Sequence, residues 1–175
     1  MHPIEIEESL KTLTLLVDSR EHPGKKLTKR VEQTGLPHRT VKLDYGDYSG
    51  EFYKGNKKVT LENTVVIERK MDGNELAMCL GRERQRFERE FQRAQSKGAI
   101  VYLLVENENF EKLYAGRYGA GRKFRSKLNP ASMMGSLFSW ACRYGIRLIL
   151  CKEETTGRII HDILYYQARE LLNNE

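Results

Sequence analysis

The segment Glu68-Arg69-Lys70 directly follows the apolar run 64–67 and carries residue types that act on phosphates. Side chains alternate between the two faces of a strand, so Glu68 and Lys70 are expected on one face and Arg69 on the other. Asp47 supplies a second carboxylate if it comes from a neighbouring strand. Two carboxylates can hold a divalent ion against a phosphate, while Lys70 steadies the attacking water and the developing charge. The pattern predicts a metal-dependent site for phosphodiester hydrolysis.

The surrounding hydrophobic patterns predict the elements that position these residues. Strands are expected over 13–17, 40–45, 52–61 as a hairpin, 64–70, 100–105 and 146–151. Helices are expected over 24–33, about 74–98, 109–114 and 129–144, with a last helix that begins at Thr155 or Thr156. Strands that alternate with helices after an early meander indicate an α/β fold, with a mixed central sheet flanked by helices.

The helix expected over 74–98 has one apolar stripe and one charged face. The charged face carries Arg82, Glu83, Arg86, Arg89, Glu90 and Arg93. Pairs such as Glu83 with Arg86 support an exposed helix, so most of this face is interpreted as a salt-bridged solvent surface. Arg82 and Arg86 are the exceptions that we expect to contact DNA, because the helix starts next to the proposed metal site.

A basic segment without any Asp or Glu lies between Lys112 and Lys152. The net charge of the chain is +6, and this segment concentrates it. Such a block attracts polyanions through phosphate contacts, although it can also be a solvated surface whose compensating acids lie elsewhere in the fold. Its glycine-rich loop lacks the spacing of a P-loop but predicts phosphate contacts for four residues. These are Arg122, Lys123, Arg125 and Lys127.

Length and composition predict one intracellular, cytoplasmic domain. The chain has 175 residues, of which 39% are hydrophobic and 31% charged, and no window has the character of a membrane span. The acidic N-terminal residues lack the cationic start and apolar core of a secretory signal. Cys79, Cys142 and Cys151 have no metal-site spacing, so zinc is disfavoured and reduced, packed thiols are expected.

Three motifs in order carry a resemblance to a known family: Val17-Asp18-Ser19-Arg20-Glu21, then Gly46-Asp47, then Glu68-Arg69-Lys70. They resemble the nuclease domain of XPF-type structure-specific endonucleases, including archaeal Hef, within the restriction-endonuclease-like superfamily. The resemblance covers about 13–172 and implies a nuclease domain over 13–175 after a short, frayed extension over 1–12. It also implies cleavage of branched or otherwise irregular DNA and dependence on Mg²⁺ or Mn²⁺.

The resemblance assigns roles to six residues of this chain. Asp47 and Glu68 would be metal ligands, and Lys70 would position the water or stabilise the pentavalent phosphate. Asp18 would join the acidic cluster as a further metal ligand from the first strand. Arg20 and Glu21 would support the site or contact the scissile phosphate, and a structural ion pair is the alternative for these two.

The chain departs from the family pattern at Asn74, where the motif places an Asp four residues after Lys70. Either Asp72 or Glu75 supplies the missing carboxylate, or the position serves the helix cap and its charge is dispensable. A weakened enzyme is the third reading. The helix-hairpin-helix module usual in the family is also lacking, so we expect a stand-alone form in which the basic segment grips the DNA. A homodimer through the nuclease domain is left open.

These observations lead to two functional hypotheses. The first is a metal-dependent endonuclease that acts on branched, flap or junction DNA in repair or recombination, in a bacterium or its phage. A resolvase of four-way junctions is a variant that requires a symmetric dimer. The second is a non-catalytic DNA-binding module or subunit that retains the nuclease fold, and metal binding separates the two.

Overall fold

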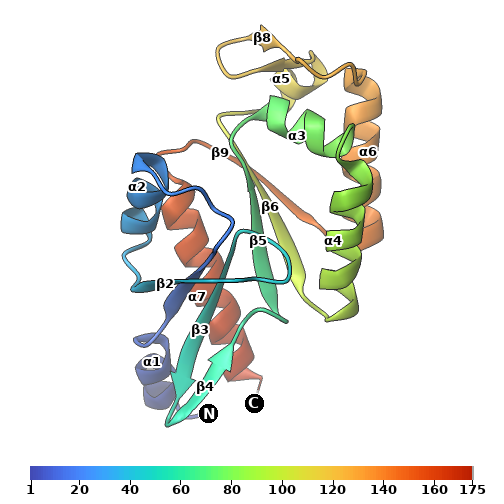
Figure 1. The fold of residues 1–175 in the computed structure, drawn as a ribbon. Helices are drawn as coiled ribbons and strands as arrows, with labels where there is room; N and C mark the ends of the chain where they lie inside the picture. The colour runs from blue at the N-terminus through green and yellow to red at the C-terminus, as the bar shows by residue number, and fades with distance from the viewer. Residues whose placement is uncertain (175) are drawn as a thin grey trace.

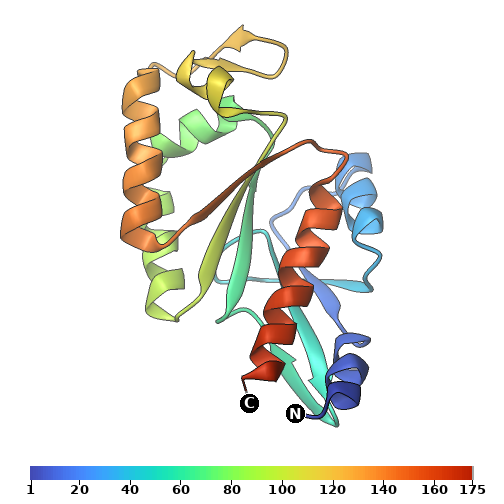
Figure 2. The ribbon, with the colours of Figure 1, turned by 180° about the vertical axis from the view of Figure 1, so that it is seen from behind.

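The computed structural model of the protein describes residues 1–174 and places a twisted mixed sheet between two layers of helices (Figures 1 and 2). The strands are β1 (Thr14–Asp18), β2 (His38–Val41), β3 (Tyr48–Lys54), β4 (Lys57–Thr60), β5 (Val65–Lys70), β6 (Ile100–Glu106) and β9 (Arg147–Cys151). Their order is β2-β1-β3-β5-β6-β9, with β4 paired to β3. Pairs β1–β2, β5–β6 and β6–β9 are parallel, and β3 is antiparallel to β1, β4 and β5. The expected fold class is confirmed.

Seven helices of the described chain cover the two faces of this sheet. They are α1 (Pro3–Leu10), α2 (Lys25–Thr34), α3 (Gly73–Leu80), α4 (Arg84–Ser96), α5 (Phe110–Tyr114), α6 (Pro130–Tyr144) and α7 (Thr156–Asn173). Helices α3, α4 and α6 pack on one face, with α5 beside them, and helices α1, α2 and α7 pack on the other. A two-stranded hairpin of β7 (Arg117–Tyr118) and β8 (Arg122–Lys123) lies beside α5 and α3.

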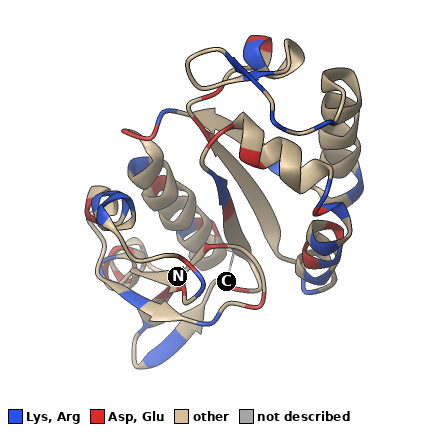
Figure 3. Cartoon of the chain, turned by 45° about the horizontal axis from the view of Figure 1, so that its top comes forward, with Lys and Arg blue, Asp and Glu red and all other residues tan. Residues whose placement is uncertain are grey.

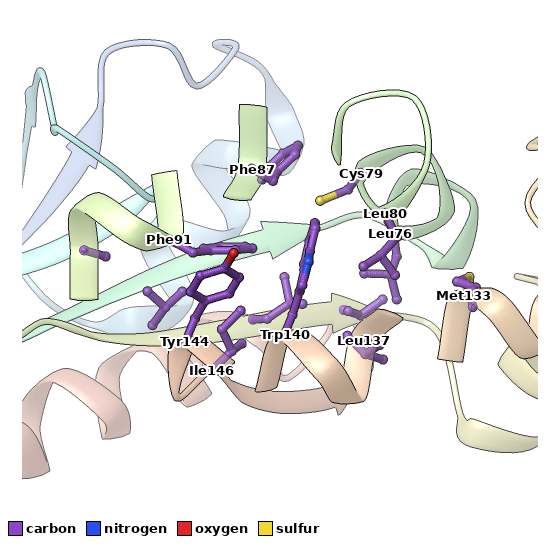
Figure 4. Close-up of a cluster of buried hydrophobic side chains, with 14 of the residues drawn as sticks. Leu76, Cys79, Leu80, Phe87, Phe91, Met133, Leu137, Trp140, Tyr144 and Ile146 are labelled. Carbon is purple, nitrogen blue, oxygen red and sulfur yellow. The ribbon is translucent and has the colours of Figure 1, made fainter. Parts of the chain in front are cut away.

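The first core lies between the sheet and helices α3, α4 and α6 (Figure 4). Its centre is an aromatic group in which the Phe91 ring meets Trp140 edge-on at 5.2 Å and Tyr144 at 6.0 Å between centroids. Trp140 is fully buried, and its indole N–H donates to Glu88 at 3.0 Å. Burial of each such ring contributes about 1.5–3 kcal/mol, so this group holds α4 and α6 together over the strands.

The second core lies on the opposite face, under α7. Leu15, Tyr48 and Ile67 point into it from β1, β3 and β5, and Ile160 and Leu164 meet them from α7. Because β5 contributes Val66 to the first core and Ile67 to the second, its side chains alternate between two buried faces. The same alternation decides which face of β5 carries Glu68 and Lys70.

Two expected elements differ from the structure around the site. The single helix over 74–98 is wrong: α3 ends at Leu80 and α4 begins at Arg84, because Gly81 adopts φ −104°, ψ −96°, outside the helical region. The strand over 40–45 is also wrong, since β2 ends at Val41 and a loop follows. The Leu43 N–H in that loop donates to the Asp18 side chain at 2.9 Å instead of to a strand partner.

Three further segments depart from expectation. The N-terminal extension forms α1, with a reciprocal cap between His2 and Glu5 and with Ile6 buried. The basic loop over 116–127 contains the β7–β8 hairpin. Cys142 is exposed, against the expectation of packed thiols, while Cys79 is buried. No helix within residues 1–174 is long and apolar enough to cross a bilayer.

The contact of α2 with α7 depends on a glycine and gives a matched stability test. A Cβ at Gly157 would lie 2.4 Å from both the Arg30 carbonyl oxygen and the Gln33 Cβ, whereas a Cβ at Gly135 meets nothing within 4 Å. We therefore expect Gly157→Ala to lower the free energy of unfolding by roughly 1–3 kcal/mol. Gly135→Ala, in the middle of α6, is expected to be neutral or to stabilise by up to about 1 kcal/mol. Urea midpoints of the two variants check this, and equal midpoints would contradict it.

Candidate active site

Two backbone hydrogen bonds hold Asp47 in place independently of its side chain. Gly46, at φ +74°, lets the chain turn against β5, where a Cβ would lie 3.1 Å from the Val66 Cβ. The Asp47 N–H then donates to the Ile67 carbonyl at 2.8 Å, and the Asp47 carbonyl accepts from the Asp18 N–H at 2.9 Å. These two bonds place Asp47 between the end of β1 and the middle of β5.

Glu68 and Lys70 lie on the same face of β5, as the alternation predicts, and each is only 5% exposed. The Lys70 ammonium donates to Glu68 and lies 4.3 Å from the centre of the Phe87 ring of α4. The Arg69 N–H donates to the Asp47 carboxylate at 2.7 Å. Two carboxylates and an ammonium thus meet at one point, and adjoining red and blue segments mark the β5 strand in Figure 3.

A polar cleft of about 230 Å³ opens over these residues. Its lining includes five of the six residues expected to be catalytic, together with one expected DNA contact, and these are Arg20, Glu21, Asp47, Glu68, Lys70 and Arg86. His22, Arg69, Glu75 and Glu90 also line it. Of the other expected DNA contacts, Arg82, Arg125 and Lys127 line a separate groove, and Arg122 and Lys123 lie exposed on β8.

Burial and mutual repulsion shape the protonation of this site. Burial, then the neighbouring Glu68 carboxylate, raises the pKa of Asp47 well above its ordinary value, and Lys70 opposes this only in part. Burial also raises the pKa of Glu68. For Lys70, burial alone would lower the pKa, but the attraction of Glu68 and Asp47 outweighs it and the pKa is raised. Lys70 therefore keeps its proton at neutral pH and supplies positive charge.

The donor set fits a magnesium or manganese ion. Within residues 1–174 no cluster of three or more His, Cys, Asp or Glu is arranged to hold a metal, so the candidate ligands are the pair Asp47 and Glu68. In the described chain one oxygen of each carboxylate accepts a hydrogen bond, and the other oxygen accepts none. Mg²⁺ is usually held in this manner, by one or two carboxylates with waters and substrate phosphate as the remaining ligands.

Asp18 lies beside the cleft but is not part of its lining. Its carboxylate accepts four hydrogen bonds, three from Arg20 and one from the Leu43 N–H, at 2.7–2.9 Å. Burial would raise its pKa, but the Arg20 and Leu43 hydrogen bonds outweigh burial and the pKa is lowered. We therefore do not count Asp18 among the metal ligands that we propose. It ties the end of β1 to the loop that leads into Asp47.

Arg20 and Glu21 make structural contacts and also line the cleft, so the structure is compatible with both roles that the sequence left open. Arg20 is ion-paired to Asp18 and also lines the cleft. Glu21 accepts from the Tyr48 hydroxyl at 2.8 Å, and that hydroxyl in turn accepts from Arg30 at 2.8 Å. The buried carboxylate of Glu106 joins this network, since it accepts from Arg30 at 3.3 Å and from Arg69 at 3.1 Å.

Glu90 is a cleft residue that the sequence reading assigned to a solvent face. It is 8% exposed, and Arg86 lies 3.4 Å from its carboxylate. The expected Glu83–Arg86 pair is present as well, at 3.3 Å. Glu90 lies three residues after Phe87 and four before Ala94, which are both buried, so its helical spacing could have identified it.

Asn74 joins α3 to the segment that follows β8. Its side-chain oxygen accepts from the Arg125 N–H at 2.8 Å. The helix cap is provided by Asp72, whose carboxylate accepts from the N–H groups of residues 74 and 75 at 2.9 Å. Glu75 lines the cleft and accepts from the Met71 N–H at 2.6 Å. Asp72 thus serves the cap, and Glu75 is the carboxylate of this segment that reaches the cleft.

Fold and cleft together define an α/β domain of the nuclease class. The ERCC4 domain model matches residues 17–163, and the chain belongs to this family of DNA nucleases. Among solved structures it is similar to XPF from Aeropyrum pernix, with a TM-score of 0.63 and 20% identity over 91% of this chain and 67% of that one. The same protein in complex with DNA matches with a TM-score of 0.61 and 19% identity, over 90% and 66% of the two chains. Comparison with curated proteins gave no match.

The two XPF structures establish the likeness of fold, since their identity to this chain is low. The chain spans about two thirds of the length of each of them. The class of the protein therefore rests on its family membership, and the proposed roles of individual residues rest on the geometry of the cleft.

The raised pKa of Asp47 predicts a stabilising substitution. A folded-state pKa above the ordinary value of 3.8 means that ionised Asp47 lowers stability progressively as the pH rises above 3.8. Asp47→Asn keeps an oxygen for the Arg69 N–H and removes the charge, so it should raise stability at pH 8 by about 1 kcal/mol, or roughly 2–4 °C in Tm. The gain should shrink towards pH 4.

Thermal unfolding of this variant from pH 4 to pH 8 is the measurement, and Asp44→Asn, at an exposed position of the same loop, is the control for the Asp-to-Asn change itself. A loss of stability at pH 8 would contradict the expectation.

The Asn74 contact predicts a difference between two substitutions. Asn74→Asp retains an acceptor for the Arg125 N–H, whereas Asn74→Ala removes it. Hydrogen exchange at the Arg125 amide should be about tenfold or more faster in Asn74→Ala and nearly unchanged in Asn74→Asp. The Lys112 amide, capped by Asn109 at 2.9 Å, is the internal reference and should not change. Equal Arg125 exchange in the two variants would contradict the proposed link.

Proposed function

We propose that this protein is an Mg²⁺- or Mn²⁺-dependent endonuclease that hydrolyses phosphodiester bonds in branched, flap or junction DNA. The observation that carries this proposal is the meeting of Asp47, Glu68 and Lys70 in one cleft of a chain that belongs to a nuclease family. The match to an XPF structure in complex with DNA supports a DNA substrate. As part of the same proposal, we assign the protein an intracellular role in repair or recombination, the processes that act on such DNA structures.

Each residue of the cleft has a physical role in this reaction. Asp47 and Glu68 would hold the divalent ion, which supplies positive charge to the phosphate and lowers the pKa of a water. Lys70 remains protonated, so it stabilises the charge that develops on the phosphate and is not the base that activates water. Its contacts with Glu68 and with the Phe87 ring fix its position before substrate arrives.

The rim of the cleft would orient the DNA backbone. Arg20 and Arg86 both line the cleft and are substantially exposed, at 54% and 61% of their side chains. Each is already paired with carboxylates, Arg20 with Asp18 and Arg86 with Glu83 and Glu90. Arg86 can exchange the partly exposed carboxylate of Glu83 for a phosphate, because a surface ion pair contributes little to stability. Arg20 would contact a phosphate from its exposed side while it remains paired with buried Asp18.

Cleavage of labelled DNA tests the proposal. Purified protein with Mg²⁺ or Mn²⁺ should cut at least one of a flap, a fork and a four-way junction faster than linear duplex. Glu68→Gln and Lys70→Met should each reduce the rate by about 100-fold or more, because the first removes the charge of a metal ligand and the second removes the positive charge beside the reacting phosphate. Lys70→Met should keep Mn²⁺ binding by calorimetry, whereas Glu68→Gln should weaken it.

The matched control is Glu32→Gln, an exposed carboxylate of α2 outside the cleft, which should leave the rate unchanged. If the parent neither cuts any DNA nor binds Mn²⁺, the proposal fails and a non-catalytic DNA-binding module takes its place. Sedimentation in the same buffer distinguishes a monomer from the symmetric dimer that resolution of a four-way junction requires.

A further inference from the structure

A basic groove lies outside the cleft, between the α3–α4 turn and the segment that follows β8. Its volume is about 550 Å³. Arg82 borders it from the turn, Arg125 and Lys127 border it from the segment after β8, and no Asp or Glu among residues 1–174 lines it. Three cations from two distant parts of the sequence therefore converge on one hollow.

These cations are uncompensated, unlike their neighbours. Within residues 1–174, the side chains of Arg82, Arg125 and Lys127 form no hydrogen bond, ion pair or ring contact. Arg84 and Arg86 on the adjoining helix are each paired with glutamates of α4 or of the turn before it. The positive potential of the groove is therefore available to a polyanion from outside.

The groove also has an apolar component that phosphate binding alone does not need. Met78 is 39% exposed there, and Leu128 is half-buried beside it. The bases of a duplex are stacked on each other and cannot reach such a surface, whereas an unpaired strand exposes the faces of its bases. Met is polarisable and adapts to the ring placed against it. A groove that combines cationic side chains with the apolar side chains of Met78 and Leu128 therefore fits an unpaired strand better than a duplex.

The groove is continuous with the cleft. A shallow hollow over the α3–α4 turn shares Arg86 with the cleft, and it shares Gly81 and Arg82 with the groove. The hydrogen bond from the Arg125 N–H to Asn74 holds one wall of the groove against α3. The helix break at Gly81 therefore lies in the middle of a surface path that leads from Glu68 and Lys70 to Arg125 and Lys127.

We propose that this groove binds the unpaired strand of the DNA substrate, with phosphates on Arg82, Arg125 and Lys127 and bases against Met78 and Leu128. As a statement about the substrate, the proposal rests on the proposed nuclease function. Binding itself needs no metal and no cleavage, so the groove can be tested whether or not the protein cuts DNA.

The test measures binding in EDTA by fluorescence anisotropy, with a labelled 20-mer of thymidine and a blunt duplex of the same length as probes. The variant Arg82→Ala/Lys127→Ala should weaken binding of the single strand about tenfold or more and that of the duplex less than twofold. It should also reduce the salt slope for the single strand by about 1.4, because each phosphate contact contributes about 0.7. Lys29→Ala/Lys57→Ala removes two exposed cations elsewhere and should change neither.

Met78→Ser tests the contribution of the apolar side chains separately from that of the charges. It should weaken single-strand binding several-fold with the salt slope unchanged. Glu68→Gln should leave single-strand binding intact, so loss of cleavage in that variant and loss of binding in the groove variants are independent results.

Three outcomes would overturn the proposal. The first is an equal loss for both probes in Arg82→Ala/Lys127→Ala, which would make the groove a general backbone contact. The second is no loss for the single strand. The third is competition by a 20-residue polyglutamate as strong as that by thymidine 20-mer, which would identify an acidic protein segment as the occupant.

Discussion

The hydrogen bonds of the Asp47 backbone are the constraint on which the rest of the site depends. They join the end of β1 to the middle of β5 through a residue that belongs to neither strand. Asp18 contributes twice to this junction, through its N–H to Asp47 and through its carboxylate to Leu43 in the preceding loop. A half-buried carboxylate beside Glu68 is electrostatically costly, so it needs a backbone that is held in place.

The central strand β5 serves two buried faces with different charge balances. On the first-core face, two carboxylates share one ammonium, and their unfavourable proximity is retained. On the second-core face, Arg69 and Arg30 share Glu106, and Arg30 also pairs with Glu21, so the charges there are balanced. The charged side chains of the two faces come from neighbouring residues of β5, and the Arg69 N–H connects the two faces by its hydrogen bond to Asp47. Residues on both faces therefore influence the position of the same carboxylate.

The sequence predicted the parts of the site that depend on local alternation and missed those that depend on tertiary contacts. The common face of Glu68 and Lys70 follows from strand geometry, and the turn at Gly46 follows from the lack of a Cβ. The helix break at Gly81 could not be read from an apolar stripe, because the spacing of Leu80 and Phe87 fits one continuous helix. The saturation of Asp18 by Arg20 and the link from Asn74 to Arg125 require knowledge of which loops meet.

The two cores differ in how much of the chain each one needs. The first core, next to the cleft, is built from residues within 45–146, whereas the second draws on residues from 6 to 172. During synthesis the first core can assemble while α7 is still within the ribosome, and the second must wait for that helix. Formation of the second core brings α1 and α7 together, and this contact between distant parts of the sequence has the greatest loop-closure entropy. The core beside the cleft can therefore form before the core on the opposite face of the sheet.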